Sequence, residues 1–407
     1  MQTIIFLGSN KSGSSREAII AAAEMGYFTV LLTDRRKWRR QREEFPDVHQ
    51  MIMMKDLSDR EEIFEQLLNI RVQGKRVKAF VSFIDPLVSL AADISKELGL
   101  QEVSVGALYK MEDKTRFRDE LKRNPVSPQF CVCSLDIDAD KIFDHHVNKL
   151  PVVLKSPISN GSKDVIKADS REEFLKGVQY FKKNFSHIPL LIEEYLSGPQ
   201  YLIEVVVRHA KTEIVAIIEQ EISSNRRFII TGYHMPARLA PDANETLTAA
   251  IEYIMKDIGL SHGTCHLEMR HVNDEWKLIE INPRISGSVI NQMILESTGI
   301  CLVRETLKLY LGEDLCLVPF KNEHVFAEFL TVDTPGKLIK VTGKNKAKKI
   351  EGVKKVYVKP RKGSILNPPL SMGDRYAYVL ASSSDPAKAK EIAKRAAEEI
   401  KFYLEPL

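Results

Sequence analysis

Two stretches near the middle of the chain have the pattern of a β-hairpin: His266-Leu267-Glu268-Met269-Arg270 and Trp276-Lys277-Leu278-Ile279-Glu280-Ile281-Asn282, the second continuing as Pro283-Arg284-Ile285-Ser286-Gly287-Ser288. Side chains alternate faces along a strand, so Glu268 shares a face with His266 and Glu280 shares one with Asn282. A three-residue turn, 273–275, would place Glu268 opposite Glu280 and His266 opposite Asn282. A four-residue turn would instead put the two carboxylates on opposite faces.

The predicted pairing has a chemical consequence. Two carboxylates that face each other repel, and burying them costs free energy unless the charge is compensated. A divalent cation removes this cost, and Glu268, Glu280 and Asn282 offer the carboxylate and amide oxygens that suit Mg²⁺ or Mn²⁺. The alternative is an exposed hairpin whose glutamates are simply hydrated.

The run from Glu280 to Arg284 resembles the metal-binding hairpin of the ATP-grasp ligases, and other elements of that family occur upstream in the family's order. They are Lys114 at the start of a helix-like stretch, Lys155 at the end of the apolar run 150–154, the loop Ser159-Asn160-Gly161-Ser162-Lys163, and the segment Leu190-Leu191-Ile192-Glu193-Glu194-Tyr195-Leu196-Ser197-Gly198-Pro199. The resemblance covers roughly residues 1–400, and within the family it is closest to the bacterial L-amino acid ligases.

The fold class expected from this resemblance is mixed α/β and α+β. Alternating strands (4–7, 28–33, 79–83) and helices (15–25, capped by serines; 60–70; 86–98) predict a parallel sheet at the N-terminus. The expected domains are a Rossmann-like α/β domain at 1–107, a small lid at 108–185, an ATP-grasp catalytic domain at 186–315, and a C-terminal α+β domain with an antiparallel sheet at 316–407. A final helix is expected at 386–403. The first loop, 8–13, lacks G-x-G-x-x-G, so no dinucleotide site is expected there.

Composition excludes several classes of protein. The net charge of +4 is small for 407 residues and gives no reason to expect nucleic acid, and the basic run 35–42 is interpreted as a solvated loop. No apolar run approaches membrane-spanning length. The N-terminus reads as a strand rather than a signal peptide, and the five cysteines contain no C-x-x-C. We therefore expect a cytoplasmic protein with reduced thiols and no membrane partner. The oligomeric state stays open, a homodimer included.

The resemblance implies a role for each nucleotide-binding motif. Lys114 and Lys155 correspond to the lysines that grip the phosphates, and the loop at Gly161 and Ser162 to the one that closes over them. Glu193 corresponds to the residue that accepts from the adenine amino group, and the backbone near Leu196 to a second adenine contact. Gln200 stands where the family usually has a ribose-binding glutamate. The implied cofactors are ATP and Mg²⁺ or Mn²⁺, with two ions. Surface lysines, an ordinary turn and a solvated glutamate pair are the alternatives.

The remaining expected site residues concern catalysis and substrate. Arg284 and Gly287 correspond to the family residues that hold the tetrahedral intermediate, and Ser288 is expected to line the pocket of the second substrate. His234 lies in an element that helps bind the amino substrate, although Thr231 replaces a common family glutamate and a lone histidine is more often structural. Asp85 and Pro86 follow the strand 79–83, where the first amino acid should lie. A hydrophobic first substrate such as Leu or Met is expected, unless Asp85 turns inward and favours a cationic one.

The predicted function is that of an ATP-dependent carboxylate–amine ligase. Its substrates would be two unprotected L-amino acids, joined into a dipeptide through an aminoacyl phosphate with release of ADP and phosphate. Two alternatives remain. One is a purine-biosynthesis-type or other ATP-grasp ligase or carboxylase, and the other is a non-catalytic ATP-binding module.

Overall fold

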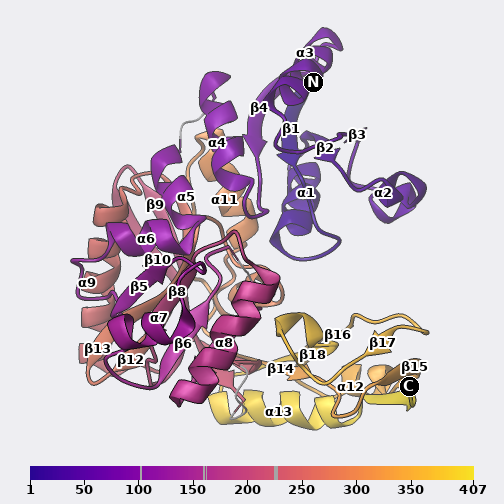
Figure 1. The fold of residues 1–407 in the computed structure, drawn as a ribbon. Helices are drawn as coiled ribbons and strands as arrows, with labels where there is room; N and C mark the ends of the chain where they lie inside the picture. The colour runs from indigo at the N-terminus through magenta and orange to yellow at the C-terminus, as the bar shows by residue number, and fades with distance from the viewer. Residues whose placement is uncertain (101–102, 159–160, 162, 224–227) are drawn as a thin grey trace.

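A computed structural model describes residues 1–100, 103–158, 161, 163–223 and 228–407 (Figure 1). The strands form four sheets: a parallel sheet at the N-terminal end, an antiparallel lid sheet, a large central sheet and a small C-terminal sheet. Figure 1 shows the N-terminal domain, in indigo, at the top and the C-terminal segment, in yellow, at the bottom, with the lid and most of the central sheet to their left. The predicted fold class is confirmed.

The N-terminal sheet is parallel and has the strand order β3-β2-β1-β4. The two inner strands, β1 and β2, bury every side chain but the first because helices cover both faces. Adjacent β1 and β4 place the loops that follow them, 8–13 and 82–87, side by side at one sheet edge. The elements are β1 (Gln2–Leu7), α1 (Ser14–Glu24), β2 (Phe28–Thr33), α2 (Lys37–Arg40), η1 (Arg42–Glu44), β3 (Gln50–Met53), α3 (Arg60–Val72), β4 (Arg76–Val81) and α4 (Val88–Glu97).

The start of α1 differs from the expected serine cap. Gly13 is the N-cap residue, at φ +83°, and no side chain caps the helix. The Ser15 hydroxyl instead accepts a hydrogen bond from the Asn10 backbone N–H at 3.0 Å. It therefore fixes the loop before the helix rather than the helix end. A β-carbon at Gly13 would lie 3.4 Å from the Ser288 backbone nitrogen, so this loop lies against the loop that follows the hairpin.

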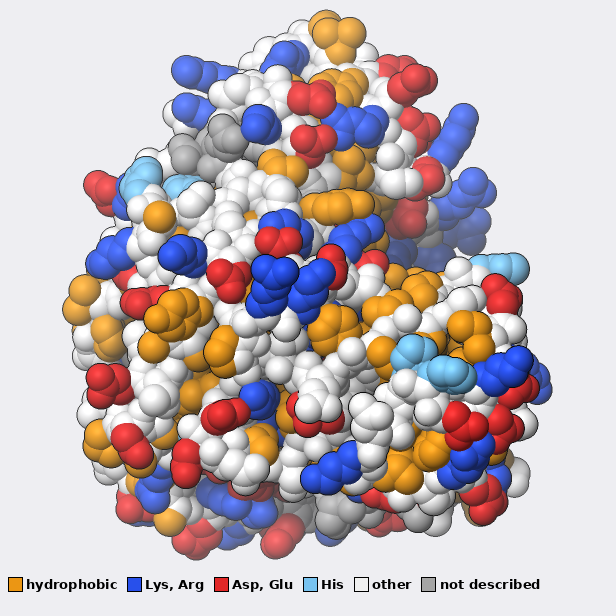
Figure 2. All heavy atoms as spheres, turned by 60° about the vertical axis from the view of Figure 1, so that its left-hand side comes forward, with side chains coloured by type: hydrophobic (Ala, Val, Ile, Leu, Met, Phe, Trp, Pro, Cys, Tyr) orange, Lys and Arg blue, Asp and Glu red, His pale blue; other side chains and the backbone are white. Residues whose placement is uncertain are grey.

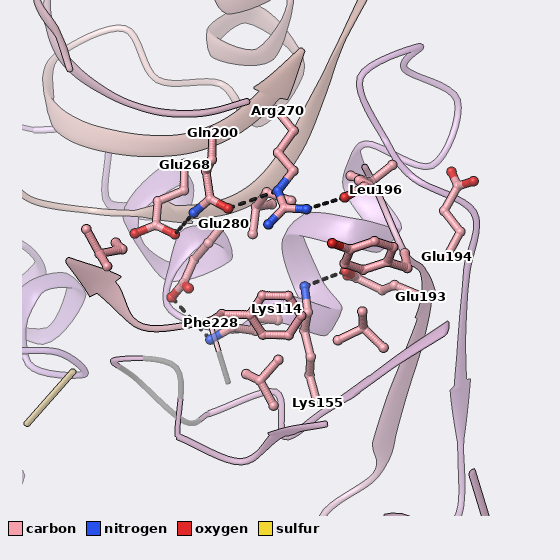
Figure 3. Close-up of a pocket in the computed structure, with 15 residues that line it drawn as sticks. Lys114, Lys155, Glu193, Glu194, Leu196, Gln200, Phe228, Glu268, Arg270 and Glu280 are labelled. Carbon is pink, nitrogen blue, oxygen red and sulfur yellow. Dashed lines mark hydrogen bonds and ion pairs between the residues drawn. The ribbon is translucent and has the colours of Figure 1, made fainter. Parts of the chain in front are cut away.

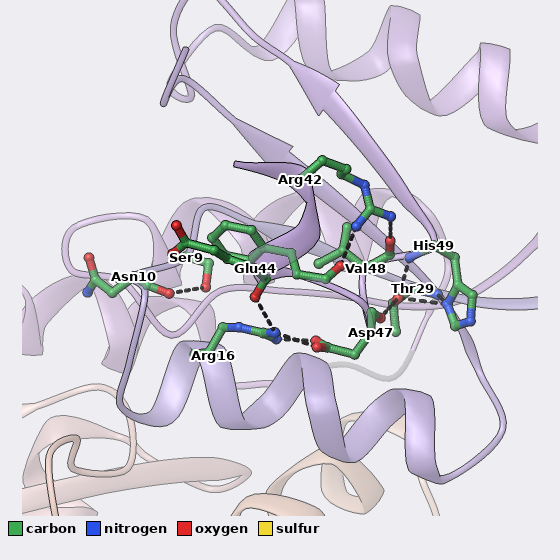
Figure 4. Close-up of polar contacts among 10 residues, drawn as sticks. Ser9, Asn10, Arg16, Thr29, Arg42, Glu44, Asp47, Val48 and His49 are labelled. Atoms are coloured by element: carbon green, nitrogen blue, oxygen red, sulfur yellow. Dashed lines mark hydrogen bonds and ion pairs between the residues drawn. The ribbon is translucent and has the colours of Figure 1, made fainter. Parts of the chain in front are cut away.

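The basic run after β2 is solvated as expected at Arg35, Arg36, Lys37, Arg39 and Arg40, but it is helical rather than a loop. It forms α2 and η1, and Trp38 is buried at 5% exposure. The Arg42 guanidinium donates to the backbone carbonyls of Phe45 and Val48, and Arg16 pairs with Asp47 (Figure 4). Trp38 and Arg42 are thus bound to the domain itself.

The lid has an antiparallel sheet of order β5-β8-β6-β7, with α7 and α8 packed against it. Strand β8 lies between β5 and β6, so the lid sheet includes residues beyond 185. The lid elements, with the two short helices that precede them, are α5 (Val105–Met111), α6 (Lys114–Glu120), β5 (Phe130–Cys133), α7 (Ala139–His146), β6 (Val152–Lys155), β7 (Val165–Ala168), α8 (Arg171–Asn184) and β8 (Leu190–Glu194).

The central sheet has the order β13-β12-β9-β10-β11-β14-β18-β16 and is antiparallel. Its last three strands come from the C-terminal part of the chain, so that part completes the catalytic sheet. The elements up to residue 330 are β9 (Gln200–Arg208), β10 (Lys211–Ile222), β11 (Ile230–Met235), α9 (Pro241–Ile258), β12 (Gly263–Val272), β13 (Glu275–Asn282), α10 (Ile290–Thr298), α11 (Leu302–Leu311) and β14 (His324–Leu330).

A small sheet of order β17-β15-β19 closes the C-terminal end. The expected helix 386–403 is too long, because α13 ends at Glu398 and the last residues form a strand. Residues 401–405 alternate between exposed and half-buried as they pair with β15. The remaining elements are β15 (Gly336–Thr342), α12 (Lys344–Lys348), β16 (Val353–Val358), β17 (Ile365–Leu366), η2 (Met372–Asp374), β18 (Ala377–Ser383), α13 (Pro386–Glu398) and β19 (Lys401–Glu405).

Charges of both signs are mixed over the face of the molecule in Figure 2, and no single-sign field dominates it. This pattern fits the small net charge of +4. Across the described part of the chain, every helix is too short or too polar to span a bilayer.

Candidate active site

The hairpin of β12 and β13 pairs Glu268 with Glu280 and His266 with Asn282, as predicted. The turn, however, has two residues rather than three. Asn273 and Asp274 both adopt positive φ (49° and 62°), as a tight hairpin turn requires. A β-bulge between the Glu268 and Met269 pairings then supplies the extra residue. Without the bulge the two glutamates would be out of register, so the bulge brings both carboxylates to one face.

The paired carboxylates lie in a buried, asymmetric field. Burial acts to raise the pKa of Glu280, but Lys114, with Nζ at 3.2 Å, acts together with Lys155 and His266 to lower it overall. Glu268 is half-buried opposite Glu280 and accepts from Gln200 Nε2 at 3.2 Å. Burial, and next the Glu280 charge, raise the pKa of Glu268 to about 7. With a pKa of about 7, Glu268 is only partly ionised when no cation is bound, and a divalent cation on the pair would favour its charged form.

His266 fixes the third expected metal ligand. Its Nδ1 lies 2.8 Å from the Arg284 carbonyl oxygen, which can only accept. Nδ1 therefore carries the proton, and Nε2 accepts from the Asn282 side-chain amide at 3.1 Å. Burial, then Arg284, lower the pKa of His266 to about 4, so the ring stays neutral. The Asn282 amide nitrogen is thus engaged, and its carbonyl oxygen is the atom left to serve as a ligand.

Lys155 and Glu193 meet at the inner end of the lid sheet (Figure 3). Lys155 Nζ lies 2.5 Å from Glu193 Oε2, and Arg118 Nε lies 2.6 Å from Oε1. Burial alone would raise the pKa of Glu193, but the charges of Arg118 and Lys155 hold it at about 2. Asp113 caps the start of α6, and Arg118 follows Lys114 by one helical turn. One short helix therefore brings both cations to the site.

A polar row across three strands forms another wall of the same cavity (Figure 3). Gln200 on β9 lies directly opposite Gln220 on β10 and Arg270 on β12. Its amide donates to Gln220 at 2.7 Å, and its carbonyl accepts from Arg270 Nε at 3.0 Å. Arg270 also donates to the Leu196 carbonyl. This cavity is lined by Lys114, Val153, Lys155, Val165, Glu193, Glu194, Tyr195, Leu196, Gln200, Phe228, Ile230, Glu268, Arg270, Ile279 and Glu280.

A second cavity shares Glu268 and Glu280 with the first and extends toward the N-terminal domain. Both loops at the edge of the parallel sheet contribute to it, through Ser12 to Ser15 and through Asp85. The Arg284 guanidinium donates to Asp85, with Nε at 2.9 Å. The other carboxylate oxygen of Asp85 is buried and has no hydrogen-bond partner among the described residues. Asp85 therefore faces the cavity rather than capping α4, whose N-cap is Leu87.

The C-terminal segment reaches the second cavity through Met372 and Arg375. The guanidinium of Arg375 lies 3.8 Å from the ring centroid of Phe329, and its Nε donates to the Met372 carbonyl at 3.3 Å. Its Nη1 is buried and, in the described part of the chain, lacks a hydrogen-bond partner. The Met372 N–H donates to the Gly161 carbonyl at 3.3 Å, which ties this segment to the lid loop.

Most of the residues expected from sequence come together in the two cavities. Gly161, Gly287 and Ser288 line the second cavity, with Ser288 at φ +61°. Ser162 lies outside the described residues. Pro86 and His234 do not line either cavity. The ring of His234 lies against His324 and Phe326. Its neighbour on β11, Tyr233, points to the other face of the strand and lines the second cavity.

Five polar residues of the site had no role predicted from sequence: Arg118, Glu204, Gln220, Arg270 and Arg375. Two of them could have been predicted from their spacing. Arg118 lies four residues after Lys114 on a helix, and Arg270 lies two residues after Glu268 on a strand, so each shares a face with a predicted site residue. Gln220 and Glu204 depend on strand pairing. Glu204 is fully buried on β9, where its carboxylate accepts from the Ser286 N–H at 3.0 Å. Arg375 gives no local signal.

Family models match three segments of the chain. The ATP-grasp domain matches residues 148–292, the ATP-grasp N-terminal domain matches 19–100, and L-amino acid ligase C-terminal domain 2 matches 328–405. The two ATP-grasp models together cover more than half of the chain. They include Lys155, Glu193 and the whole β12–β13 hairpin.

Curated relatives match over part of their length. An uncharacterized protein, y4rH, of Sinorhizobium fredii is 28% identical over 265 residues, which are 63% of this chain and 54% of that protein. Carnosine synthase 1 of Mus musculus is 24% identical over 262 residues, 60% of this chain and 32% of the synthase. The matched region thus spans about half or less of these relatives.

Solved structures share the fold over nearly the whole chain. L-amino acid ligase from Bacillus licheniformis has a TM-score of 0.81 at 18% identity, covering 99% of this chain and 98% of that one. Phosphoribosylglycinamide synthetase from Anaerococcus prevotii has a TM-score of 0.73 at 15% identity, covering 99% of both chains. With the family models and the two-cavity site, these matches lead to one conclusion: the chain belongs to the ATP-grasp ligase superfamily and carries a C-terminal domain of the L-amino acid ligase type.

Proposed function

We propose that the protein is an ATP-dependent carboxylate–amine ligase that joins two amino acids through an aminoacyl phosphate. One observation carries the proposal: the cavity suited to a nucleotide and the cavity suited to an amino acid meet at Glu268 and Glu280. A phosphate held at this junction would lie between the two compartments. A carboxylate entering from the second cavity could then attack it.

In the first cavity, the proposed ligand is ATP. Lys114 and Lys155 supply the cations that phosphate oxygens need, and Gly161 of the lid lines the adjoining cavity. Both carboxylate oxygens of Glu193 are engaged by Arg118 and Lys155. We therefore assign Glu193 to holding Lys155, and the adenine contacts to the backbone of residues 194–196. Gln200, engaged by Arg270 and Gln220, would reach the ribose only if one of those bonds is exchanged.

Glu268, Glu280 and Asn282 fit Mg²⁺ or Mn²⁺, because they combine two facing carboxylates with an amide oxygen. Such ions neutralise charge on transferring phosphates. The two carboxylates offer up to four oxygens, enough for two ions that share them. Lys114 would hold Glu280 in its charged form before ATP arrives.

The proposed chemistry has two steps. The carboxylate of the first amino acid attacks the γ-phosphorus, the bond to ADP breaks, and an aminoacyl phosphate forms. The amine of the second amino acid then attacks the carbonyl carbon, phosphate leaves, and the amine loses a proton. Arg284 and Gly287 both line the second cavity. The Arg284 guanidinium and the backbone at Gly287 would donate to the oxyanion of the tetrahedral intermediate.

The second cavity offers complementary groups for zwitterionic substrates. The free oxygen of Asp85 suits an ammonium group, and the free Nη1 of Arg375 suits a carboxylate. Asp85 is turned inward, and one of its oxygens remains available beside the contact with Arg284. We therefore propose that it receives a cationic group of the first substrate. That group is either the α-ammonium group, which keeps Leu or Met as the expected substrate, or the side chain of Arg.

The sugar-phosphate ligands of purine-type enzymes have less support. They need a basic phosphate site in the N-terminal domain, and the loop 8–13 offers only Lys11, which lies 2.8 Å from Glu44. A purely ATP-binding module has no use for Arg284 and Arg375 in a second cavity.

The test is phosphate release from ATP and Mg²⁺ with all pairs of amino acids, together with nucleotide analysis and product mass. We expect ADP and phosphate in equal amounts, only when two amino acids are present, and a product whose mass is that of a dipeptide. AMP formed stoichiometrically with product would exclude the acyl-phosphate route. Turnover with a phosphorylated sugar amine, but with no amino acid pair, would support the purine-type alternative instead.

A further inference from the structure

The lid carries two cysteines and a histidine that the nucleotide site does not use. Cys131 and Cys133 lie two residues apart on β5, so they share one face of the strand, while Val132 between them is exposed on the other face. Their sulfur atoms are 3.8 Å apart. His146 is the last residue of α7, and one ligand atom of each of the three residues lies within 4.8 Å of the other two.

Packing within the lid holds the three residues together. Ile142 of α7 is fully buried in the lid core with Cys133, and Phe143 packs against the same core. β5 is an edge strand of the lid sheet, so the cluster lies at the rim of the domain. Cys133 is buried, Cys131 half-buried and His146 exposed. The group therefore has a fixed inner side and an outer side that is open to solvent.

The sulfur separation matches a shared metal ion better than a disulfide. Zinc–thiolate bonds of about 2.3 Å place two sulfurs of a tetrahedral site about 3.8 Å apart. A disulfide needs the sulfurs at about 2.0 Å and the α-carbons usually within about 6.8 Å. Two residues along an extended strand span about 6.6 Å, which is near that upper limit. Bond formation would thus require β5 to contract, whereas metal binding would not.

We propose that Cys131, Cys133 and His146 bind a thiophilic divalent cation of the Zn²⁺ or Cd²⁺ class, with the fourth position open to water or an external donor. Binding releases the thiol protons and joins the end of α7 to β5. Strand β5 pairs with β8, where Phe130 lies opposite Glu193, so the ion would stiffen the strand pair that holds the Lys155–Glu193 contact. The sulfur ligands separate this site from the oxygen ligands of the catalytic ions.

The experiment titrates the reduced, chelator-treated full-length protein with CdCl₂ and follows thiolate-to-cadmium charge-transfer absorption. ZnCl₂ is titrated separately against a chromogenic chelator. We expect one equivalent of tight binding. Cys131→Ser and Cys133→Ser should each abolish the absorption band at that stoichiometry, and His146→Ala should weaken binding by about tenfold or more. Each variant should still bind ATP, which shows that the lid is folded.

Matched controls are Cys316→Ser, which removes an exposed cysteine outside the lid, and His145→Ala, which removes the neighbouring ring. Both should bind Cd²⁺ as the unmodified protein does. The proposal is overturned if Cd²⁺ binds equally well to Cys131→Ser and Cys133→Ser, or if no stoichiometric binding occurs. It is also overturned if mass spectrometry shows that mild oxidation closes a Cys131–Cys133 disulfide in a protein that does not bind either metal.

Discussion

Asp85 and Arg284 lie 199 positions apart in sequence yet share two hydrogen bonds at the base of the second cavity. Asp85 belongs to the loop after β4 of the N-terminal sheet, and Arg284 follows the metal hairpin. Both side chains are largely shielded from solvent, at 11% and 19% exposure. The contact therefore connects the loop proposed to bind the first substrate with the arginine proposed to stabilise the intermediate.

Asp85→Asn should reduce kcat/KM for the first amino acid by roughly ten- to a hundredfold. The amide can still accept from Arg284, but it loses the negative charge that would attract an ammonium group, a charge-assisted bond worth about 1.5–3 kcal/mol. Steady-state kinetics with Leu, Met and Arg as first substrate measure the effect. Asp93→Asn, in the more exposed pair with Arg60, is the control. A clear preference of the unmodified enzyme for Arg, lost in Asp85→Asn, would instead assign Asp85 to the side chain of the substrate.

Arg284→Lys should lower kcat by about 10²–10³-fold, the usual cost of losing one donor to an oxyanion. Lysine keeps the charge but not the planar fork, so the charge alone should not restore the rate. Single-turnover measurements separate this loss from binding. A lysine variant with normal kcat would exclude a role for the guanidinium geometry.

Glu280→Gln should abolish turnover while the protein remains folded. The amide removes a charged metal ligand and also relieves the repulsion with Glu268. Activity is measured across a Mg²⁺ titration, and the fold by circular dichroism. Glu275→Gln, at the exposed start of the same strand, should behave as the unmodified enzyme does. Near-normal activity of Glu280→Gln at ordinary Mg²⁺ concentrations would show that the hairpin does not bind the metal.

Arg375→Lys should raise KM for the second amino acid by about tenfold or more and change kcat little, because the proposed contact forms on binding. The decisive comparison uses the corresponding amino acid amide as the amine. The amide lacks the carboxylate, so the variant and the unmodified enzyme should use it equally well. Arg361→Lys, at an exposed position, is the control. An equal loss with amide and acid would show that Arg375 only supports the local structure.

Glu204→Gln should reduce the pH dependence of stability. Burial raises the pKa of Glu204 to about 7 from 4.5, so the native state holds this proton more tightly than the unfolded chain does. The contribution of the Glu204 proton to the free energy of unfolding is complete below about pH 4.5 and is lost as the pH rises through about 7. The variant should lose less Tm between about pH 5 and about pH 8 than the unmodified protein, with exposed Glu245→Gln as the control. An unchanged difference would mean that Glu204 is already ionised in the native state.

The pairing of Glu268 with Glu280 could be predicted from the sequence, but the two-residue turn and the β-bulge that produce it could not. The alternation of side chains along each strand predicted that the two carboxylates could face each other. The bulge at Ile279 depends instead on how the strand twists in its sheet. The motif lysines were recognisable because each lies at the boundary of a regular element. Arg375 and Asp85 could not be assigned in the same way, because their contacts join segments brought together only by tertiary packing. The error at the C-terminus is similar: residues 401–405 become a strand because β15 offers a partner, which local propensity does not record.

The position of β14 has a practical consequence for building chimeric proteins from this chain and its relatives. This strand pairs with β11 on one side and β18 on the other, in the middle of the central sheet. Cutting the chain near residue 316 would leave β11 with a long unpaired edge, the kind of surface at which sheets aggregate. A chimera that exchanges C-terminal segments between relatives would therefore need to keep the β11–β14 pairing intact, and the segment cannot be treated as a detachable module.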